Sequence, residues 1–190
     1  PVTTYDKTTF NVVPGDPAAV TLPTEESDKA SQVEDGKGGF TFTMGPGNSH
    51  KGGRLDFGDH LKLEDGQEAV FHVKRLEVDN GDGWVAFFFT LKGERGSLNI
   101  TPRTAEQTYV SSSLPKFKVE RGNFSVEYPA VYRIRRTGDT IEFLYNNDVF
   151  YTADAQKAEG LDEIQIFLGS QKPAARALME ISAIELRSVK

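Results

Sequence analysis

The chain has 190 residues, a length that a single domain accounts for, and 37% hydrophobic with 26% charged residues is the composition of a globular protein. The net charge of −6 argues against nucleic acid as the main partner, because a phosphate binder needs a basic face. The absence of cysteine excludes disulfides, thiolate catalysis and Cys-ligated zinc. No run of about 18 apolar residues is present, so we expect no membrane insertion.

Residues 1–38 differ in composition from the rest of the chain. They contain Pro14, Pro17, Pro23 and an acidic cluster at 25–28, with few apolar residues and no sustained period. This composition predicts an extended N-terminal arm over 1–38, followed by a domain over 39–190. The arm can run along its own domain as an edge strand, through residues 5–13, or it can pack on a neighbouring subunit and make a homo-oligomer or larger assembly.

From residue 39 onward the hydrophobic pattern is that of β-strands. In the long strand predicted over 67–78, Phe71 and Val73 share one face while Leu76 and Val78 share the other, so we expect a bulge near residues 74–75 that restores one core face. Residues 84–91 are apolar on both faces, which is typical of a central strand covered on both sides. Shorter strands are expected at 40–44, 54–57, 61–63, 97–101, 107–112, 116–120, 124–127, 163–168 and 178–186, and one helical turn at 154–159.

The stretch Tyr132 to Asp154 predicts three strands joined by two tight turns. Apolar and polar residues alternate along it, and Gly, Asn and Asp at 138–139 and 146–148 tolerate positive φ where the chain reverses. If residues 138–139 form a two-residue loop, Arg135 faces Glu142 across the hairpin as a surface ion pair.

This stretch, together with DEIQIFLG at 162–169 and MEISAIEL at 179–186, resembles the C-terminal half of concanavalin A-like (laminin-G-like) lectin and glucanase jelly rolls. The resemblance implies an all-β fold, a two-sheet antiparallel jelly-roll sandwich of the concanavalin A-like type. It implies carbohydrate binding as the commonest use of that fold, although a fold alone does not determine a function.

A carbohydrate site needs aromatic rings on which sugars stack and polar groups that bind hydroxyls. Trp84 is the only tryptophan, and Tyr109 lies in a polar strand, so these are the stacking candidates. For Trp84, packing in the core remains an open alternative to sugar stacking, and for Tyr109 the two interpretations are equally open. Arg133 and Arg135 could bind hydroxyls, or they could belong to a plain solvated face. The candidate binding residues are Trp84, Tyr109, Asn80, Asp82, Arg133 and Arg135.

The loop at residues 79–83 is also a possible calcium site. Asp79, Asn80 and Asp82 supply three oxygen-bearing side chains, and calcium takes six to eight oxygen ligands. The simpler interpretation is a type I′ turn at Asn80-Gly81, which needs no ion. We therefore expect no cofactor, with calcium as the open alternative. The three histidines, His50, His60 and His72, show no metal-ligand spacing.

Glycosidases place two carboxylates roughly 5–9 Å apart, and laminarinase-like families carry them in an E-x-D-x-E pattern on one strand. That pattern is absent here. Glu127 and Glu142 lie on different strands and could meet across a sheet, but nothing in the sequence selects them as a catalytic pair. The first hypothesis is therefore a lectin-like recognition domain without enzymatic activity, at an extracellular or virion surface. The alternatives are a structural protein of an assembly, such as a virion decoration or fibre protein, and a glycoside hydrolase or polysaccharide lyase with an unrecognised site.

Overall fold

The computed structural model describes the backbone of five short strands before residue 57, and residues 61–79, 85–104, 107–114, 125–158, 160–170 and 176–189. Side chains are described over 61–78, 87–102, 108–114, 125–158, 160–166 and 178–189. The predicted strand at 116–120 and the candidate residues Trp84, Asn80 and Asp82 lie outside these ranges.

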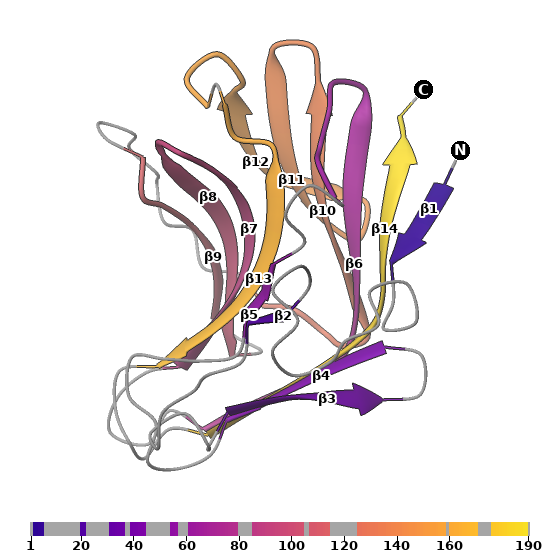
Figure 1. Ribbon diagram of the computed structural model, residues 1–190, viewed down its shortest axis with the longest axis vertical. Coiled ribbons are helices and arrows are strands. Elements are labelled where there is room, and N and C mark those ends of the chain that lie inside the picture. The colour runs from indigo at the N-terminus through magenta and orange to yellow at the C-terminus, as the bar shows by residue number, and fades with distance from the viewer. Residues whose placement is uncertain are drawn as a thin grey trace.

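The strands form two antiparallel sheets that stand face to face (Figure 1). The eight-stranded sheet has the order β12 (Asp148–Asp154), β11 (Thr140–Tyr145), β10 (Ala130–Thr137), β6 (Gln67–Asp79), β14 (Arg176–Ser188), β4 (Gly39–Met44) and β3 (Ser31–Gly36), with β1 (Val2–Tyr5) also on β14. The six-stranded sheet has the order β2 (Val20–Thr21), β5 (Arg54–Asp56), β13 (Glu163–Ser170), β7 (Val85–Gly93), β8 (Gly96–Thr104) and β9 (Gln107–Ser112). The described residues contain no helix, so the predicted all-β antiparallel sandwich is confirmed.

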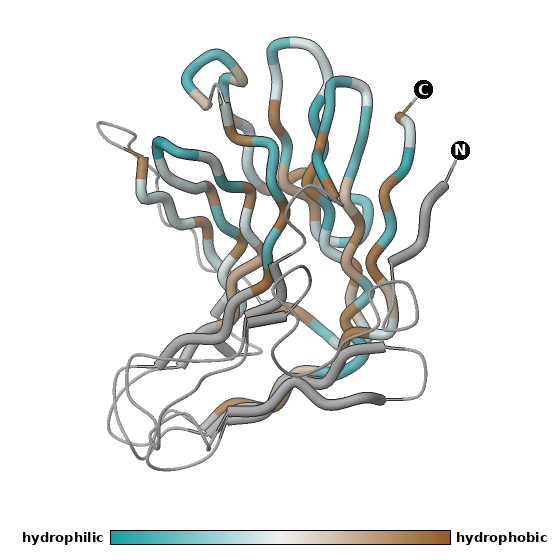
Figure 2. Tube along the Cα trace, viewed as in Figure 1, coloured by the Kyte–Doolittle hydropathy of each residue, from teal (hydrophilic) through white to brown (hydrophobic). Residues whose placement is uncertain are grey.

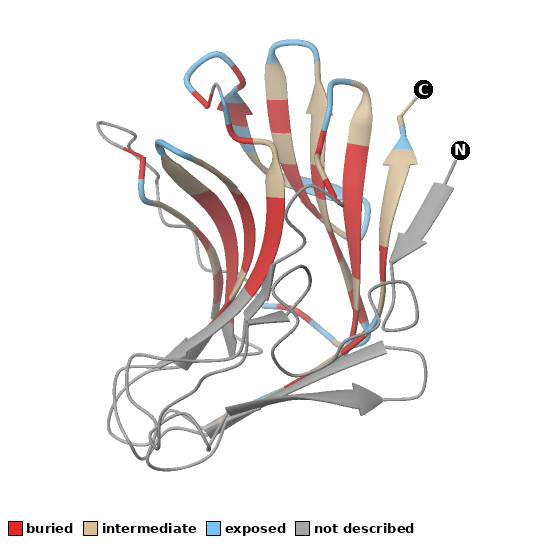
Figure 3. Cartoon of the chain, viewed as in Figure 1, coloured by how far each residue is buried: buried red, intermediate tan, exposed pale blue. Residues whose placement is uncertain are grey.

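The hydrophobic core lies between the two sheets. Hydrophobic and hydrophilic residues alternate along the strands (Figure 2), and the buried stretches of β6, β7, β8, β10 and β13 lie where the sheets face one another (Figure 3). Phe71 from β6 stacks on Phe89 from β7 with ring centroids 4.6 Å apart, and Tyr132 from β10 lies 5.3 Å from Phe89. All three side chains are fully buried, so the alternation of each strand is explained by one buried face.

The expected bulge in β6 is present at Lys74. Val73 pairs with Ile181 and Arg75 pairs with Glu180, so Lys74 is the extra residue on its strand. Leu76 and Val78 consequently return to the inner face and pack against the core. The bulge thus lets one long strand keep a single hydrophobic face over its whole length.

The two tight turns are also where the pattern predicts them. Thr137 pairs with Thr140, which leaves a two-residue loop with Gly138 at φ +57°, and Tyr145 pairs with Asp148 around Asn146 at φ 52°. Glycine and asparagine are the residues that adopt this left-handed backbone most readily. Arg135 therefore pairs with Glu142 across the hairpin, as expected.

Two predicted strands are wrong. Residues 61–63 form only a single bridge between Lys62 and Glu163, with both flanking leucines buried. Residues 125–127 are outside the sheets, because the Glu127 backbone N–H donates to the Tyr145 hydroxyl (3.1 Å) and not to a strand ladder. The short helical turn has support in a hydrogen bond from the Ala158 N–H to the Asp154 carbonyl (3.3 Å).

Three described segments of the first 38 residues pair with strands of the same chain. β1 lies on β14, β2 on β5, and β3 forms a hairpin with β4. The boundary between an arm and a domain at residue 38 stays a prediction. Within the described part of the chain, no helix is long and apolar enough to span a membrane.

Candidate functional site

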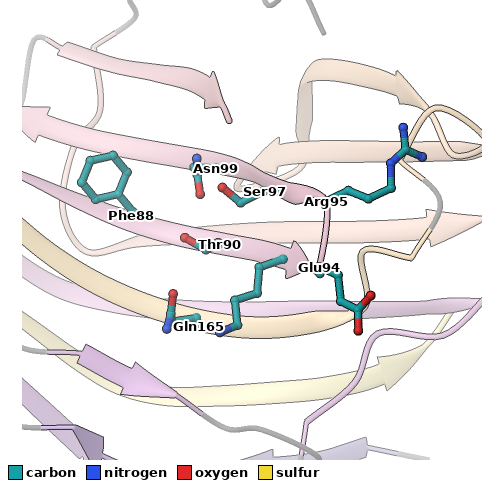
Figure 4. A pocket seen from close by; sticks show the side chains of 10 residues that line it. Phe88, Thr90, Glu94, Arg95, Ser97, Asn99 and Gln165 are labelled. Atoms are coloured by element: carbon teal, nitrogen blue, oxygen red, sulfur yellow. The ribbon is translucent and has the colours of Figure 1, made fainter. Parts of the chain in front are cut away.

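A hollow of about 460 Å³ lies on the outer face of the six-stranded sheet, over β7, β8 and β13 (Figure 4). We call it the β7–β8 hollow. Phe88, Thr90, Lys92, Gly93, Glu94, Arg95, Gly96, Ser97, Asn99 and Gln165 line it.

Strand alternation explains why these side chains face outward. Phe87, Phe89 and Leu91 of β7 are fully buried in the core, so Phe88 and Thr90 between them point to the opposite face. The same alternation places Ser97 and Asn99 of β8, and Gln165 of β13, on that outer face. On this outer face Phe88 is partly buried and Thr90 is almost fully buried, so the expectation that the central strand is covered on both sides is confirmed only in part.

The floor of the hollow is made of neutral polar groups that are almost fully buried. Thr90 is 5% exposed, and Asn99 and Gln165 are each 8% exposed. The Asn99 Nδ2 group donates to the Ser111 hydroxyl (3.2 Å), which shares a further hydrogen bond with the Thr101 hydroxyl (2.9 Å). These bonds hold the Asn99 amide in one orientation, and Figure 4 shows it beside Ser97 on β8, across from Thr90.

The charged groups of the hollow lie at one end, near the β7–β8 hairpin. The Lys92 Nζ atom is 3.8 Å from Glu163 Oε2, and both side chains are about one-third exposed. Glu94 and Arg95 are adjacent in the hairpin and point away from the amide floor (Figure 4). Lys92 therefore has a carboxylate beside it, whereas the side chains of Glu94 and Arg95 point in different directions (Figure 4).

Tyr109 lies on the same outer face as the hollow. Its neighbours in β9, Thr108 and Val110, are buried toward the core, and Tyr109 pairs in register with Thr101 of β8. It does not line the hollow itself. The role of Tyr109 as a stacking residue stays a prediction. Its position on the same face as the polar floor is compatible with that role.

Arg133 and Arg135 lie on the outer face of the other, eight-stranded sheet. Arg135 Nη2 is 3.1 Å from Glu68 Oε2, and Arg133 Nη1 is 3.4 Å from Glu68 Oε1. Glu68 is only 7% exposed, so the ion pairs are largely withdrawn from water. The structure therefore does not bring these arginines together with Tyr109.

The remaining candidate residues from the sequence that the structure describes also lie outside the hollow. Glu142 contacts Arg135 (3.9 Å) on the eight-stranded sheet, and Glu127 is exposed beside Tyr145. His72 faces outward and its Nε2 atom lies 2.7 Å from Glu185 Oε2, in keeping with the expected hydrogen-bonded histidine. Asp79 ends β6 and only its backbone is described. No group of three metal-ligating side chains occurs among the described residues, which leaves calcium binding at 79–82 untested.

The sequence interpretation did not select Thr90, Asn99 or Gln165. The one available signal is the pattern SLNIT at 97–101, in which polar residues alternate with Leu98 and Ile100. Nothing in that pattern distinguishes a binding face from an ordinary solvated face, because both alternate with period two.

Comparison with protein-family models and with curated proteins finds no match to this sequence. Among solved structures, a glycoside hydrolase family 16 endo-glucanase from Bacteroides ovatus, in complex with G4G3G-2F-DNP, has a TM-score of 0.63 at 13% identity, over 97% of this chain and 99% of the other. A transglycosylase in its apo form has a TM-score of 0.61 at 13% identity, over 100% and 85%. A pseudo β-1,3-glucanase of Mycobacterium tuberculosis has a TM-score of 0.58 at 10% identity, over 92% and 93%.

This chain has the concanavalin A-like jelly-roll fold. The resemblance seen in the sequence is thereby confirmed at the level of the fold. These findings contradict the expectation of a protein without enzymatic activity, because the similar structures are mostly endo-glucanases and transglycosylases. These structures give no support to a virion decoration protein or to a homo-oligomer held by the arm.

Proposed function

We propose that this protein is a carbohydrate-active domain that binds a polysaccharide chain across the outer face of its six-stranded sheet. The observation that carries the proposal is the β7–β8 hollow, whose floor is built from amide and hydroxyl groups beside the aromatic ring of Phe88. Sugar hydroxyls both donate and accept hydrogen bonds, as side-chain amides and hydroxyls do. The volume of about 460 Å³ lies in the range of small-molecule sites.

The fixed orientation of the floor favours binding. Asn99 is held through Ser111 and Thr101, and its side chain is almost fully buried before any ligand arrives. Groups that are already ordered lose little further entropy on association, so each hydrogen bond to a sugar contributes more to affinity. The similar endo-glucanase was solved in complex with a ligand, which supports a glycan as the class of partner for this fold.

Binding is tested by affinity electrophoresis and calorimetry over a panel of soluble polysaccharides. Asn99→Ala and Gln165→Ala are each expected to weaken binding about tenfold, because each removes a hydrogen-bonding group from the floor. Arg75→Ala is the matched control, since Arg75 is 48% exposed on the eight-stranded sheet. Equal affinities for all four proteins would contradict the placement of the site, and no binding by any of them would contradict the function.

The second candidate function is cleavage or transfer of the bound glycan, which the similar enzymes favour. Glu163 contacts Lys92 of the hollow at 3.8 Å, and Asp56 of β5 pairs in register with Gln165, two residues from Glu163 on β13. Glycosidases need two carboxyl groups that flank the scissile bond, and these two acidic residues belong to neighbouring strands of one sheet.

This candidate is tested by incubating the protein with each polysaccharide it binds and measuring new reducing ends and products by mass spectrometry. Glu163→Gln and Asp56→Asn are expected to abolish turnover while leaving binding within about threefold, because each keeps the size of the side chain. Turnover that is unchanged in both variants would exclude this pair of carboxylates as the catalytic groups.

A further inference from the structure

We infer that the β7–β8 hollow selects uncharged polysaccharides and discriminates against polyanionic ones, those that carry carboxylate or sulfate groups along the chain. This inference rests on the proposed function and specifies its ligand class. It follows from where the neutral and the charged groups of the hollow lie.

The part of the hollow that a sugar ring would contact most closely is neutral. Thr90, Asn99 and Gln165 are at least nine-tenths buried, and none of them carries charge. An amide or hydroxyl can replace the water around a sugar hydroxyl, but it cannot replace the water around a carboxylate or sulfate without a large cost. A charged substituent over this floor would therefore lose hydration that the floor does not restore.

The cations at the end of the hollow do not offset this cost. Lys92 is already paired with Glu163 at 3.8 Å, and the exposed Arg95 points away from the amide floor (Figure 4). An anionic ligand that approaches Lys92 also approaches the Glu163 carboxylate, so attraction and repulsion largely cancel. Sites that recognise carboxylates or sulfates instead present arginine or lysine in excess of nearby acids.

The charge of the whole chain acts in the same direction. The net charge is −6, so a polyanion is repelled on approach and its association is slowed at low salt. The arginine-rich surface on the eight-stranded sheet does not reverse this for the hollow, because Arg133 and Arg135 are paired with Glu68 on the other side of the sandwich.

The test uses matched pairs of polymers: neutral glucans and xylans, and the same polymers with a fraction of their primary or side-chain positions carrying carboxylate or sulfate. We expect the wild-type protein to bind at least one neutral polymer about tenfold more tightly than its charged partner at physiological salt. Equal or tighter binding of the charged partner overturns the inference while leaving polysaccharide binding intact. Binding to neither member of any pair overturns the proposed function itself.

A charge variant tests the cause of the selectivity. Glu163→Gln removes the carboxylate that offsets Lys92, and we expect it to raise the affinity for the charged polymer about threefold, an effect that disappears at high salt. Glu77→Gln is the matched control: it changes the net charge by the same amount, but Glu77 is 63% exposed on the eight-stranded sheet. If both variants raise the affinity equally, the net charge is responsible and the local pairing of Lys92 is not.

Discussion

The ion pairs around Glu68 are expected to contribute to the stability of the sandwich, and Glu68→Gln measures that contribution. The carboxylate is 7% exposed and meets two guanidinium groups, at 3.1 Å and 3.4 Å. At an effective dielectric constant near 20, each contact is attractive by about 5 kcal/mol before desolvation is subtracted. Breaking a buried pair typically costs about 3–5 kcal/mol.

The lower end of that range applies here. Arg133 and Arg135 are 20% and 25% exposed, so water restores part of their hydration, and Arg135 keeps its contact with Glu142 at 3.9 Å. We expect a loss of about 3 kcal/mol, which lowers the melting temperature by roughly 6–12 °C in a domain of this size. Glu142→Gln, at a more exposed and longer contact, should cost at most about 1 kcal/mol.

Thermal and urea unfolding of the three proteins measure both values. If Glu68→Gln and Glu142→Gln are equally stable, burial of the ion pair does not determine its contribution and the reasoning is refuted. A glycan affinity that is unchanged in Glu68→Gln is also expected, because this cluster lies on the opposite side of the sandwich from the β7–β8 hollow.

Three further outcomes are expected. Gly93→Ala should cost about 3 kcal/mol in urea unfolding, because a Cβ there would overlap the Gly160 carbonyl oxygen. Gly138→Ala, whose Cβ would meet no atom within 4 Å, should cost only about 1 kcal/mol for its positive φ. Burial raises the pKa of Glu185, but hydrogen bonds from histidine and arginine side chains outweigh it and hold that pKa below its ordinary 4.5. The carboxylate therefore stabilises the fold above pH 4.5 and loses that effect as the pH falls below it, so Glu185→Gln should be less stable than wild type at neutral pH, with the difference shrinking in acid. Burial raises the pKa of Tyr132 to about 12, so stability should decline as the pH rises above 10, the ordinary value, and Tyr132→Phe should show a smaller decline in unfolding at alkaline pH.

The fold could be predicted because its signals are local. Gly138 and Asn146 each mark a reversal by their tolerance of positive φ, and the alternation between them gives the strand pairing directly. The bulge at Lys74 could be predicted for the same reason, because a change of phase within one strand is visible in a dozen residues. The strand predicted over 61–63 was wrong because two buried leucines pack there without forming a ladder of backbone hydrogen bonds.

The candidate site could not be predicted because its residues meet only through the sheet register. Gln165 lies opposite Thr90, and Thr90 lies opposite Asn99, across three strands whose order does not follow the sequence. Each of these residue types is common on solvated strands, so none is conspicuous by itself. Arg135 shows the same limit: the hairpin predicts its partner Glu142, but the closer partner, Glu68, comes from a distant strand.

The two outer faces of the sandwich therefore differ in how readily they can accept a ligand. On the eight-stranded sheet, Arg133 and Arg135 contact Glu68, and a ligand that used these arginines would first have to displace a buried carboxylate. On the six-stranded sheet, the floor residues are neutral, and a sugar hydroxyl can replace water there without separating any ion pair. Displacement of water costs far less than separation of a buried ion pair, so the proposed site on the six-stranded sheet would bind a neutral glycan at lower cost than the eight-stranded sheet would.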